Sequence, residues 1–216
     1  MRAVALIGCC YNLLTERAGK TYKVPITRSS YPRLVEAANT ADPHGFPISD
    51  TFEQENVTLN ITARSMACQA PTNWARGGSS DFFVRHFWRA LLQRILADRG
   101  LLDDPSNPVI LGSLKKDSYD SFHKYVNAAA VKMGWGEEMR LSAEEAEGYE
   151  REYKPRHKDL CVMWSLMAVA AGVVESLIVV DRWLFLKEME GVEAWVEQVF
   201  EYSESPRNLV VVGVRK

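Results

Sequence analysis

The chain has 216 residues, of which 47% are hydrophobic and 25% charged, with a net charge of −2. These proportions are ordinary for a soluble globular domain, or for part of a larger one. The near balance of charge excludes a general attraction to nucleic acid or anionic membranes, so any such contact needs a local basic patch. Cys9, Cys10, Cys68 and Cys161 follow no repeating framework, which favours reduced thiols in an intracellular protein.

The first apolar run comes directly after the initiator. Residues 3–8 read AVALIG, and Cys9-Cys10-Tyr11-Asn12 then breaks the run. An apolar run without polar alternation is typical of a strand buried on both faces of a sheet. Such a strand needs neighbours on both edges, so we expect residues 1–12 to belong to a sheet whose earlier strands are missing from this chain.

Residues 13–158 are predicted to form a long insertion of loops and helices. Turn formers dominate 13–58, with one extended piece around 22–26, and a short helix follows at 60–70. Ser80 or Asp81 can cap the next helix, and Ser142 with Glu145 forms a capping box for a later one. The remaining helices of the insertion are predicted at residues 82–99, 119–133 and 143–153.

The last part of the chain, residues 159–216, is predicted to be a long buried helix followed by a strand hairpin. The uncharged stretch at 160–174 is shorter than the roughly 18 residues needed to span a bilayer, which favours a core helix over a membrane span. Residues 195–202 and 208–214 are rich in β-branched and aromatic side chains and predict two strands. We therefore expect no membrane contact and a soluble protein of the cytoplasm or nucleus.

Four motifs occur in an order that resembles a known family. Together they resemble the C-terminal half of the methyltransferase-like 25 family, above all its fungal members, whose relatives are also labelled ribosomal RNA adenine dimethylase domain proteins. The motifs are IGCCYN at 7–12, NITAR at 60–64, ESLIVVDRWLFL at 175–186 and SPRNLVVV at 205–212.

The resemblance implies an α/β fold: the C-terminal part of a Rossmann-like class I methyltransferase sheet with a large helical insertion. Residues 3–8, 208–214 and 196–202 would be three neighbouring strands in that order. The whole chain, 1–216, would then be a single incomplete domain. Its open apolar edge strand favours a fragment, because natural proteins normally protect such edges.

The resemblance further implies a full-length enzyme that transfers a methyl group from S-adenosylmethionine to an RNA or protein acceptor. The family's cofactor site lies on strands that precede the Gly-Cys-Cys-Tyr segment. Neither Gly77-Gly78 nor Gly134-Trp135-Gly136 follows a strand and opens a helix, as a nucleotide-binding loop must. We expect this chain alone to bind no cofactor and to be inactive. The alternative is a non-catalytic paralogue that acts as a protein-interaction module.

Four of the candidate substrate-pocket residues are Cys9, Cys10, Tyr11 and Asn12. They follow the carboxyl end of a strand, where open α/β sheets place their ligands. Tyr11 or Asn12 would orient an acceptor. The alternative for the two cysteines is burial as small apolar side chains.

Asn60 and Arg64 complete the candidate pocket. Four residues apart, they share a helix face and are suited to a phosphate or a carboxylate. A capping asparagine and a salt-bridged arginine are the alternative interpretation.

Metal binding is not expected. A zinc site needs four ligands of usable spacing, and the only set that can be assembled contains two adjacent cysteines, which are awkward ligands. That set is Cys9, Cys10, His44 and Cys68.

Two groups of charged residues complete the predictions. Arg85, Arg89 and Arg94 give one helix a basic side that suits RNA phosphates, although most such faces are simply solvated. Charges also interrupt the apolar helix near the C-terminus. Buried charges must be paired, so we interpret Glu175 or Asp181 with Arg182 or Arg207 as structural ties between this helix and the final hairpin.

Overall fold

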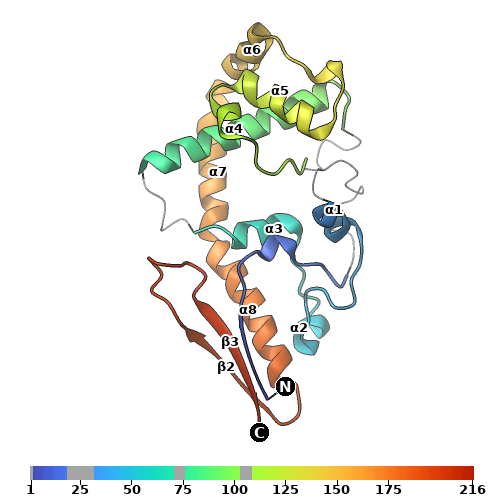
Figure 1. The fold of residues 1–216 in the computed structure, drawn as a ribbon, viewed down its shortest axis with the longest axis vertical. Helices are drawn as coiled ribbons and strands as arrows, with labels where there is room; N and C mark the ends of the chain where they lie inside the picture. Colours follow the sequence, from blue (N-terminus) through green and yellow to red (C-terminus); the bar gives the residue numbers. More distant parts are fainter. Residues whose placement is uncertain (1, 19–31, 71–75, 103–108) are drawn as a thin grey trace. The chain divides into compact units, whose positions relative to one another are not determined.

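The computed structural model describes residues 2–18, 32–70, 76–102 and 109–216 and is an α/β protein (Figure 1). The extended piece predicted at 22–26 lies outside these residues. The chain divides into two compact units. Unit 1 comprises Met1–Thr21, Ala37–Asn73 and Leu166–Lys216, and unit 2 comprises Tyr22–Glu36 and Trp74–Ser165.

Unit 1 contains a three-stranded antiparallel sheet of order β1-β3-β2. The strands are β1 (Ala3–Ile7), β2 (Val192–Gln198) and β3 (Leu209–Arg215). The predicted neighbours and their order are confirmed. β2 begins and ends several residues earlier than predicted, because Gly191, with φ of 71°, turns the chain directly into the strand.

One face of the sheet is covered by α8 (Ala171–Lys187), which packs on β2 and β3 (Figure 1). The Trp183 indole donates a hydrogen bond of 3.1 Å to the carbonyl of Ala194 on β2. The helices α2 (Asp50–Gln54) and α3 (Ile61–Ala67) and the short helix η1 (Tyr11–Leu13) complete the unit. Its core cluster is formed by Tyr11, Phe46, Leu59, Ala67 and Ile178.

The prediction that β1 is a buried strand is wrong for this chain. All five residues of β1 are apolar and all are exposed. Among the described residues, β1 pairs only with β3, so its other edge is open. The apolar run was therefore a correct signal for a strand, but its burial requires partners outside the described residues.

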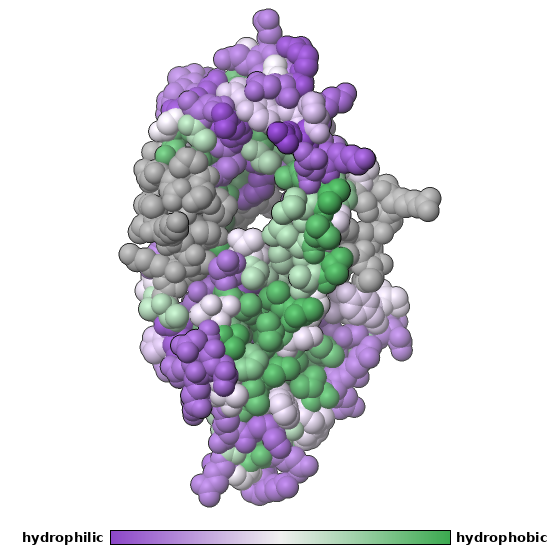
Figure 2. Space-filling model, turned by 180° about the vertical axis from the view of Figure 1, so that it is seen from behind, coloured by the Kyte–Doolittle hydropathy of each residue, from purple (hydrophilic) through white to green (hydrophobic). Residues whose placement is uncertain are grey.

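The prediction of one long buried helix near the C-terminus is also wrong. Two helices form, α7 (His157–Val169) and α8, separated at Ala170. The elements that pack on α8 cover one side, which includes Ile178 and Val179, and leave other apolar residues exposed. Figure 2 shows apolar side chains gathered on one face. The exposed apolar residues of unit 1 include Leu166, Met167, Val169, Val173 and Val180.

One helical stretch of the described chain, Ala143–Lys187, is long and apolar enough to cross a membrane by length and composition alone. Its most apolar window of 18 residues has a mean hydropathy of 2.0, and 22% of that window is buried. A core helix of a globular protein passes the same test. The expected location in the cytoplasm or nucleus stays a prediction.

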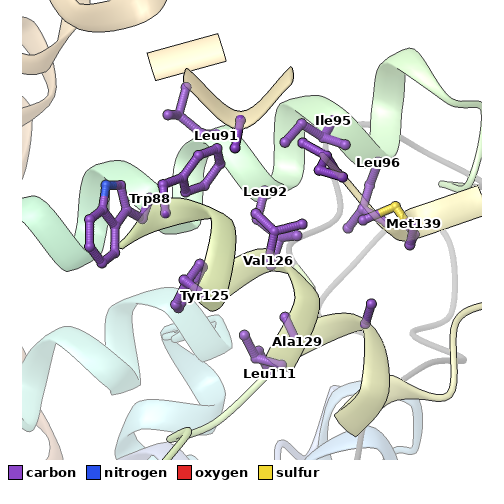
Figure 3. Packing of buried hydrophobic residues seen from close by; sticks show 14 of the residues in the cluster. Trp88, Leu91, Leu92, Ile95, Leu96, Leu111, Tyr125, Val126, Ala129 and Met139 are labelled. Carbon is purple, nitrogen blue, oxygen red and sulfur yellow. The ribbon is translucent and has the colours of Figure 1, made fainter. Parts of the chain in front are cut away.

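Unit 2 is helical, and its core lies between α4 (Arg76–Asp98), α5 (Phe122–Met133) and α6 (Ala143–Tyr153) (Figure 3). Short helices η3 (Lys116–Tyr119) and η4 (Glu137–Met139) lie between them, and η5 (Lys154–Arg156) follows α6. The buried residues include Trp88, Leu91, Leu92, Ile95, Leu96, Tyr125, Val126, Ala129 and Met139.

The local signals for these helices are mostly confirmed. Ser142 and Glu145 form the predicted capping box. Gly134, with φ of 66°, ends α5 in the left-handed conformation that glycine favours. The predicted start of α4 is wrong, since the helix begins at Arg76 and includes Gly77 and Gly78. Glycine disfavours a helix by only about 1 kcal/mol per residue, which the packing of this 23-residue helix outweighs.

Two helices lie within residues 13–58, where the sequence predicts mostly turns. They are α1 (Pro32–Asn39) and α2, where the Ser49 hydroxyl accepts the cap hydrogen bond from the backbone N–H of Phe52. Helices this short show too few turns for their periodicity to be read from sequence.

Candidate substrate-binding site

The turn after β1 brings the predicted pocket residues to one end of the sheet. Strand β1 ends at Ile7, and Gly8 then lets two side chains approach the backbone closely. A Cβ atom at Gly8 would lie 2.6 Å from Cε1 of Tyr11 and 2.7 Å from Nη1 of Arg182. Only glycine fits this position without displacing them.

Tyr11 is the anchor of the site. It starts η1, is 2% exposed, and its hydroxyl donates a hydrogen bond of 3.0 Å to the Glu175 carboxylate. Burial, with the neighbouring Glu175 charge, raises the pKa of Tyr11 well above its ordinary value. At neutral pH this phenol is therefore protonated and serves as a hydrogen-bond donor rather than a base.

Glu175 is held in turn by Arg207, whose Nη1 lies 2.6 Å from the carboxylate. Arg207 also donates a hydrogen bond of 3.3 Å to the carbonyl of Gln69. The predicted tie between the apolar helix and the final hairpin is confirmed for this pair. The Glu175–Arg207 ion pair joins α8 to the segment before β3. Because the same carboxylate accepts the Tyr11 hydrogen bond, the ion pair also helps to fix Tyr11.

Asp181 makes a different contact from the one predicted. It is 1% exposed, and its carboxylate accepts hydrogen bonds from the backbone N–H groups of Ile48 and Ser49 and from the Ser49 hydroxyl, at 2.7 to 3.1 Å. The predicted arginine partnership is thus wrong for Asp181. Three backbone and side-chain donors satisfy the buried charge instead.

Arg182 is the functional group that sequence reasoning placed incorrectly. Its guanidinium lies 5.6 Å from the centre of the Tyr11 ring, and Arg207 lies at the same distance from that ring. Partial burial lowers the pKa of Arg182. Within the described parts of the chain it makes no ion pair, which leaves one half-buried positive charge beside the turn. The signal was an arginine inside an otherwise apolar helix.

Cys9 and Cys10 are both exposed, so the alternative interpretation as buried apolar side chains is wrong. Their sulfur atoms lie 3.4 Å apart. Asn12 lies beside α3, where its Oδ1 accepts a hydrogen bond of 3.4 Å from the Cys68 thiol. The turn therefore gathers thiol, amide and guanidinium groups, all except Tyr11 at least partly open to solvent.

Asn60 and Arg64 do not form a common binding face with the residues of the turn. Asn60 is an exposed cap residue whose Oδ1 accepts a hydrogen bond of 2.8 Å from the backbone N–H of Ala63. Arg64 is 0% exposed, and its Nη2 lies 3.0 Å from Glu16. Of the two interpretations left open by the sequence, the structure gives the cap and the ion pair. Arg64 holds a carboxylate of its own chain.

Within the described residues, no group of three or more histidine, cysteine, aspartate or glutamate side chains could hold a metal ion. The arginines proposed for RNA contact each have an internal contact. Arg85 lies 4.5 Å from the centre of the Tyr119 ring, Arg89 donates to the carbonyl of Val109, and Arg94 lies 2.7 Å from Asp98. RNA contact stays a prediction.

The described glycines do not fit an S-adenosylmethionine loop. Gly77 and Gly78 lie inside the first turn of α4, and Gly134 and Gly136 follow α5. Gly8 follows a strand, but the chain then enters the three-residue helix η1, with the Tyr11 ring against the glycine. A pyrophosphate or cofactor loop needs a strand, a glycine turn and a helix N-terminus in succession.

The structure defines an α/β protein with a three-stranded antiparallel sheet, and comparison with curated proteins adds a family resemblance. Over 218 residues the chain is 30% identical to the probable methyltransferase-like protein 25 of Mus musculus. Over 226 residues it is 29% identical to the human protein of the same name. The resemblance to the methyltransferase-like 25 family is therefore confirmed.

Each alignment covers all of this chain and 33% of the relative. The chain thus spans about a third of the length of the curated relatives, rather than the half expected from the sequence. No family model matches the chain, and no solved structure matches it.

Proposed function

We propose that this chain is part of a Rossmann-like class I methyltransferase that uses S-adenosylmethionine. The observation that carries the proposal is the strand order β1-β3-β2, with β3 between the other two strands. This order is the one that the family resemblance predicts for residues 3–8, 208–214 and 196–202, which correspond to the fifth, seventh and sixth strands of a class I methyltransferase sheet. The names of the two relatives support the reaction class.

The free edge of β1 is where the rest of such a sheet would attach. Val4, Leu6 and Ile7 are apolar and exposed, and an exposed apolar edge strand is an aggregation hazard that proteins normally cover. We infer that a further strand pairs with this edge in the full-length protein. The relatives are about three times as long as the region aligned, so they have the length to supply it.

The cofactor would supply an activated methyl group for in-line transfer to a nitrogen or oxygen of the acceptor. Catalysis of this kind depends largely on alignment, which a rigid turn favours. Tyr11, fixed by Glu175, would orient the acceptor as a hydrogen-bond donor, together with Asn12, Cys9 and Cys10. The acceptor would be RNA or protein, and the 216-residue chain alone would neither bind the cofactor nor transfer methyl groups.

Calorimetric titration with S-adenosylmethionine tests this assignment. We expect no heat of binding for the 216-residue chain and micromolar binding for the full-length protein from its native cells. Micromolar binding by the 216-residue chain would contradict the placement of the cofactor site outside it. No binding by a folded full-length protein would contradict the methyltransferase assignment.

An RNA acceptor can be tested through the two exposed arginines of the proposed stripe. In the full-length protein, R85Q with R94Q should weaken RNA binding and reduce its dependence on salt, because two phosphate contacts are lost. The matched control replaces Arg140 and Arg156, which are also exposed arginines of unit 2. Equal effects of both pairs would contradict a specific stripe and favour a protein acceptor.

A non-catalytic interaction module is the second candidate, and the exposed apolar residues of unit 1 favour it. Val169 is 80% exposed and Val173 is 64% exposed. Binding of a partner that covers these apolar side chains would be favourable, because it removes them from water. A soluble complex of this chain with one other subunit in native cells, in the absence of any longer form, would support this candidate. A longer form with methyltransferase activity would exclude it.

A further inference from the structure

The two thiols that end β1 are close enough to react with each other. The Sγ atoms of Cys9 and Cys10 lie 3.4 Å apart, and both side chains are exposed. An S–S bond requires an approach to about 2.0 Å, which is a small displacement for two adjacent side chains. The pair is therefore accessible to small reagents, and closing the bond requires a change only within the turn itself.

The fold fixes the chain on both sides of this pair. Ile7, two residues before Cys9, pairs with Val210 in the sheet. Tyr11, directly after Cys10, is buried and hydrogen-bonded to Glu175. The Cys10 carbonyl also accepts a hydrogen bond of 2.9 Å from the backbone N–H of Leu13. The proximity of the thiols is thus a property of an anchored turn, not of a freely moving segment.

The two thiols interact directly. The hydrogen bond with Cys9 and the Cys9 charge raise the pKa of Cys10. A thiolate next to a protonated thiol can react with a peroxide at one sulfur. The second sulfur is then within reach to displace hydroxide from the sulfenic acid that results.

We propose that Cys9 and Cys10 form a reversible redox site that hydrogen peroxide closes to a disulfide between adjacent residues. Two S–H bonds break and one S–S bond forms. The two electrons and two protons pass to one molecule of hydrogen peroxide, which leaves as two molecules of water. The inference concerns this chain's own thiols and holds whether or not the protein transfers methyl groups.

The disulfide should be easily reduced. Its ring contains the Cys9–Cys10 peptide bond, which resists twisting away from planarity. Strain of this kind makes a disulfide more reducible than an unstrained one, and labile disulfides are the regulatory kind. The site therefore behaves as a switch that a glutathione-type thiol resets.

Peroxide treatment of dilute 216-residue chain, followed by alkylation and intact mass measurement, tests the proposal. The expected product is a monomer that has lost two hydrogens and takes up two fewer alkyl groups than the reduced chain. Peptide mapping should place the bond between residues 9 and 10, and reduced glutathione should reverse it. C9S and C10S should abolish the product, whereas C161S, which changes a thiol of unit 2, should leave it unchanged.

Two outcomes overturn the proposal. One is a bond from either residue to Cys68 or to a second molecule. The other is oxidation of the wild-type chain to sulfinic acid with no disulfide. Phenylarsine oxide gives an independent readout, since one arsenic bridges two close thiols with loss of one water. Wild type and C68S should retain one arsenical, and a wild-type chain that retains none would refute the paired geometry directly.

Discussion

The Glu175 carboxylate lies between two partners from opposite ends of the chain: Arg207 at 2.6 Å and the Tyr11 hydroxyl at 3.0 Å. Glu175 and Arg207 are nearly buried, with 12% and 11% of their side chains exposed. One carboxylate thereby joins the short helix η1 after β1, the first part of α8 and the segment before β3.

E175Q should lower the free energy of unfolding by about 3 kcal/mol, because Arg207 would remain buried without its counter-charge. Urea denaturation measures this change. Adding R207M should recover part of the loss. The matched control is E193Q, which removes the partner of Lys216 in a surface pair 62% and 72% exposed. It should cost less than about 1 kcal/mol. Equal losses in both variants would show that Glu175 is not held as described.

D181N should destabilise unit 1 by about 1 to 3 kcal/mol, since an amide cannot accept all the hydrogen bonds that Ile48 and Ser49 donate. Equilibrium unfolding in urea again provides the measurement. D159N, at an exposed carboxylate 3.3 Å from Arg156, serves as the control and should leave stability almost unchanged. A neutral result for D181N would contradict the buried network.

G8A should destabilise the protein by about 1 to 3 kcal/mol, because the added methyl group would overlap the Tyr11 ring and the Arg182 guanidinium. G172A is the matched change in the same unit. A Cβ at Gly172 meets nothing within 4 Å on α8, so it should stabilise the helix by about 0.5 to 1 kcal/mol. The opposite signs of the two effects, measured by thermal or urea unfolding, are the test.

Alkaline pH should destabilise unit 2 through Tyr125. Burial raises the pKa of Tyr125 from 10.0 to about 12. The folded state therefore holds this proton more tightly, and its stabilising effect is fully present below pH 10 and lost as pH rises towards 12. The loss amounts to about 2 kcal/mol. Y125F should reduce the drop in unfolding free energy over this pH range, and an unchanged drop would contradict the burial effect.

V169S should leave the free energy of unfolding within about 0.5 kcal/mol of wild type, because Val169 is almost fully exposed. It should also reduce the fluorescence of a dye that binds apolar surface. I178A, on the covered side of the neighbouring helix α8, should cost about 2 to 5 kcal/mol. Similar costs at both positions would mean that the surface around Val169 at the end of α7 is covered in solution.

The helix ends were predictable because their signals are local. Ser142 and Glu145 are three residues apart, and Gly134 stops α5 by its own backbone conformation. The strand order came from the family motifs, since nothing in the local sequence specifies that residues 3–7 pair with 210–214. Periodicity alone would have given three strands without an order.

The polar contacts of the site could not be read from sequence. Asp181 meets Ser49 across more than a hundred residues, and either of two arginines was an equally suitable partner for Glu175. The prediction that β1 and the C-terminal helix are buried failed for a different reason. The apolar runs of β1 and α8 report what surface should be covered, whereas exposure depends on which covering segments are present.

The register of the sheet also constrains how the protein can fold during synthesis. Ala3, near the start of the chain, pairs with Val214, near its end, so this contact has almost the largest sequence separation available. Unit 2 lies largely in one continuous stretch and can acquire its core while synthesis continues. The edge of β1 that pairs with β3 stays unpaired until residues 209–215 emerge, which makes assembly of this part of the sheet slow.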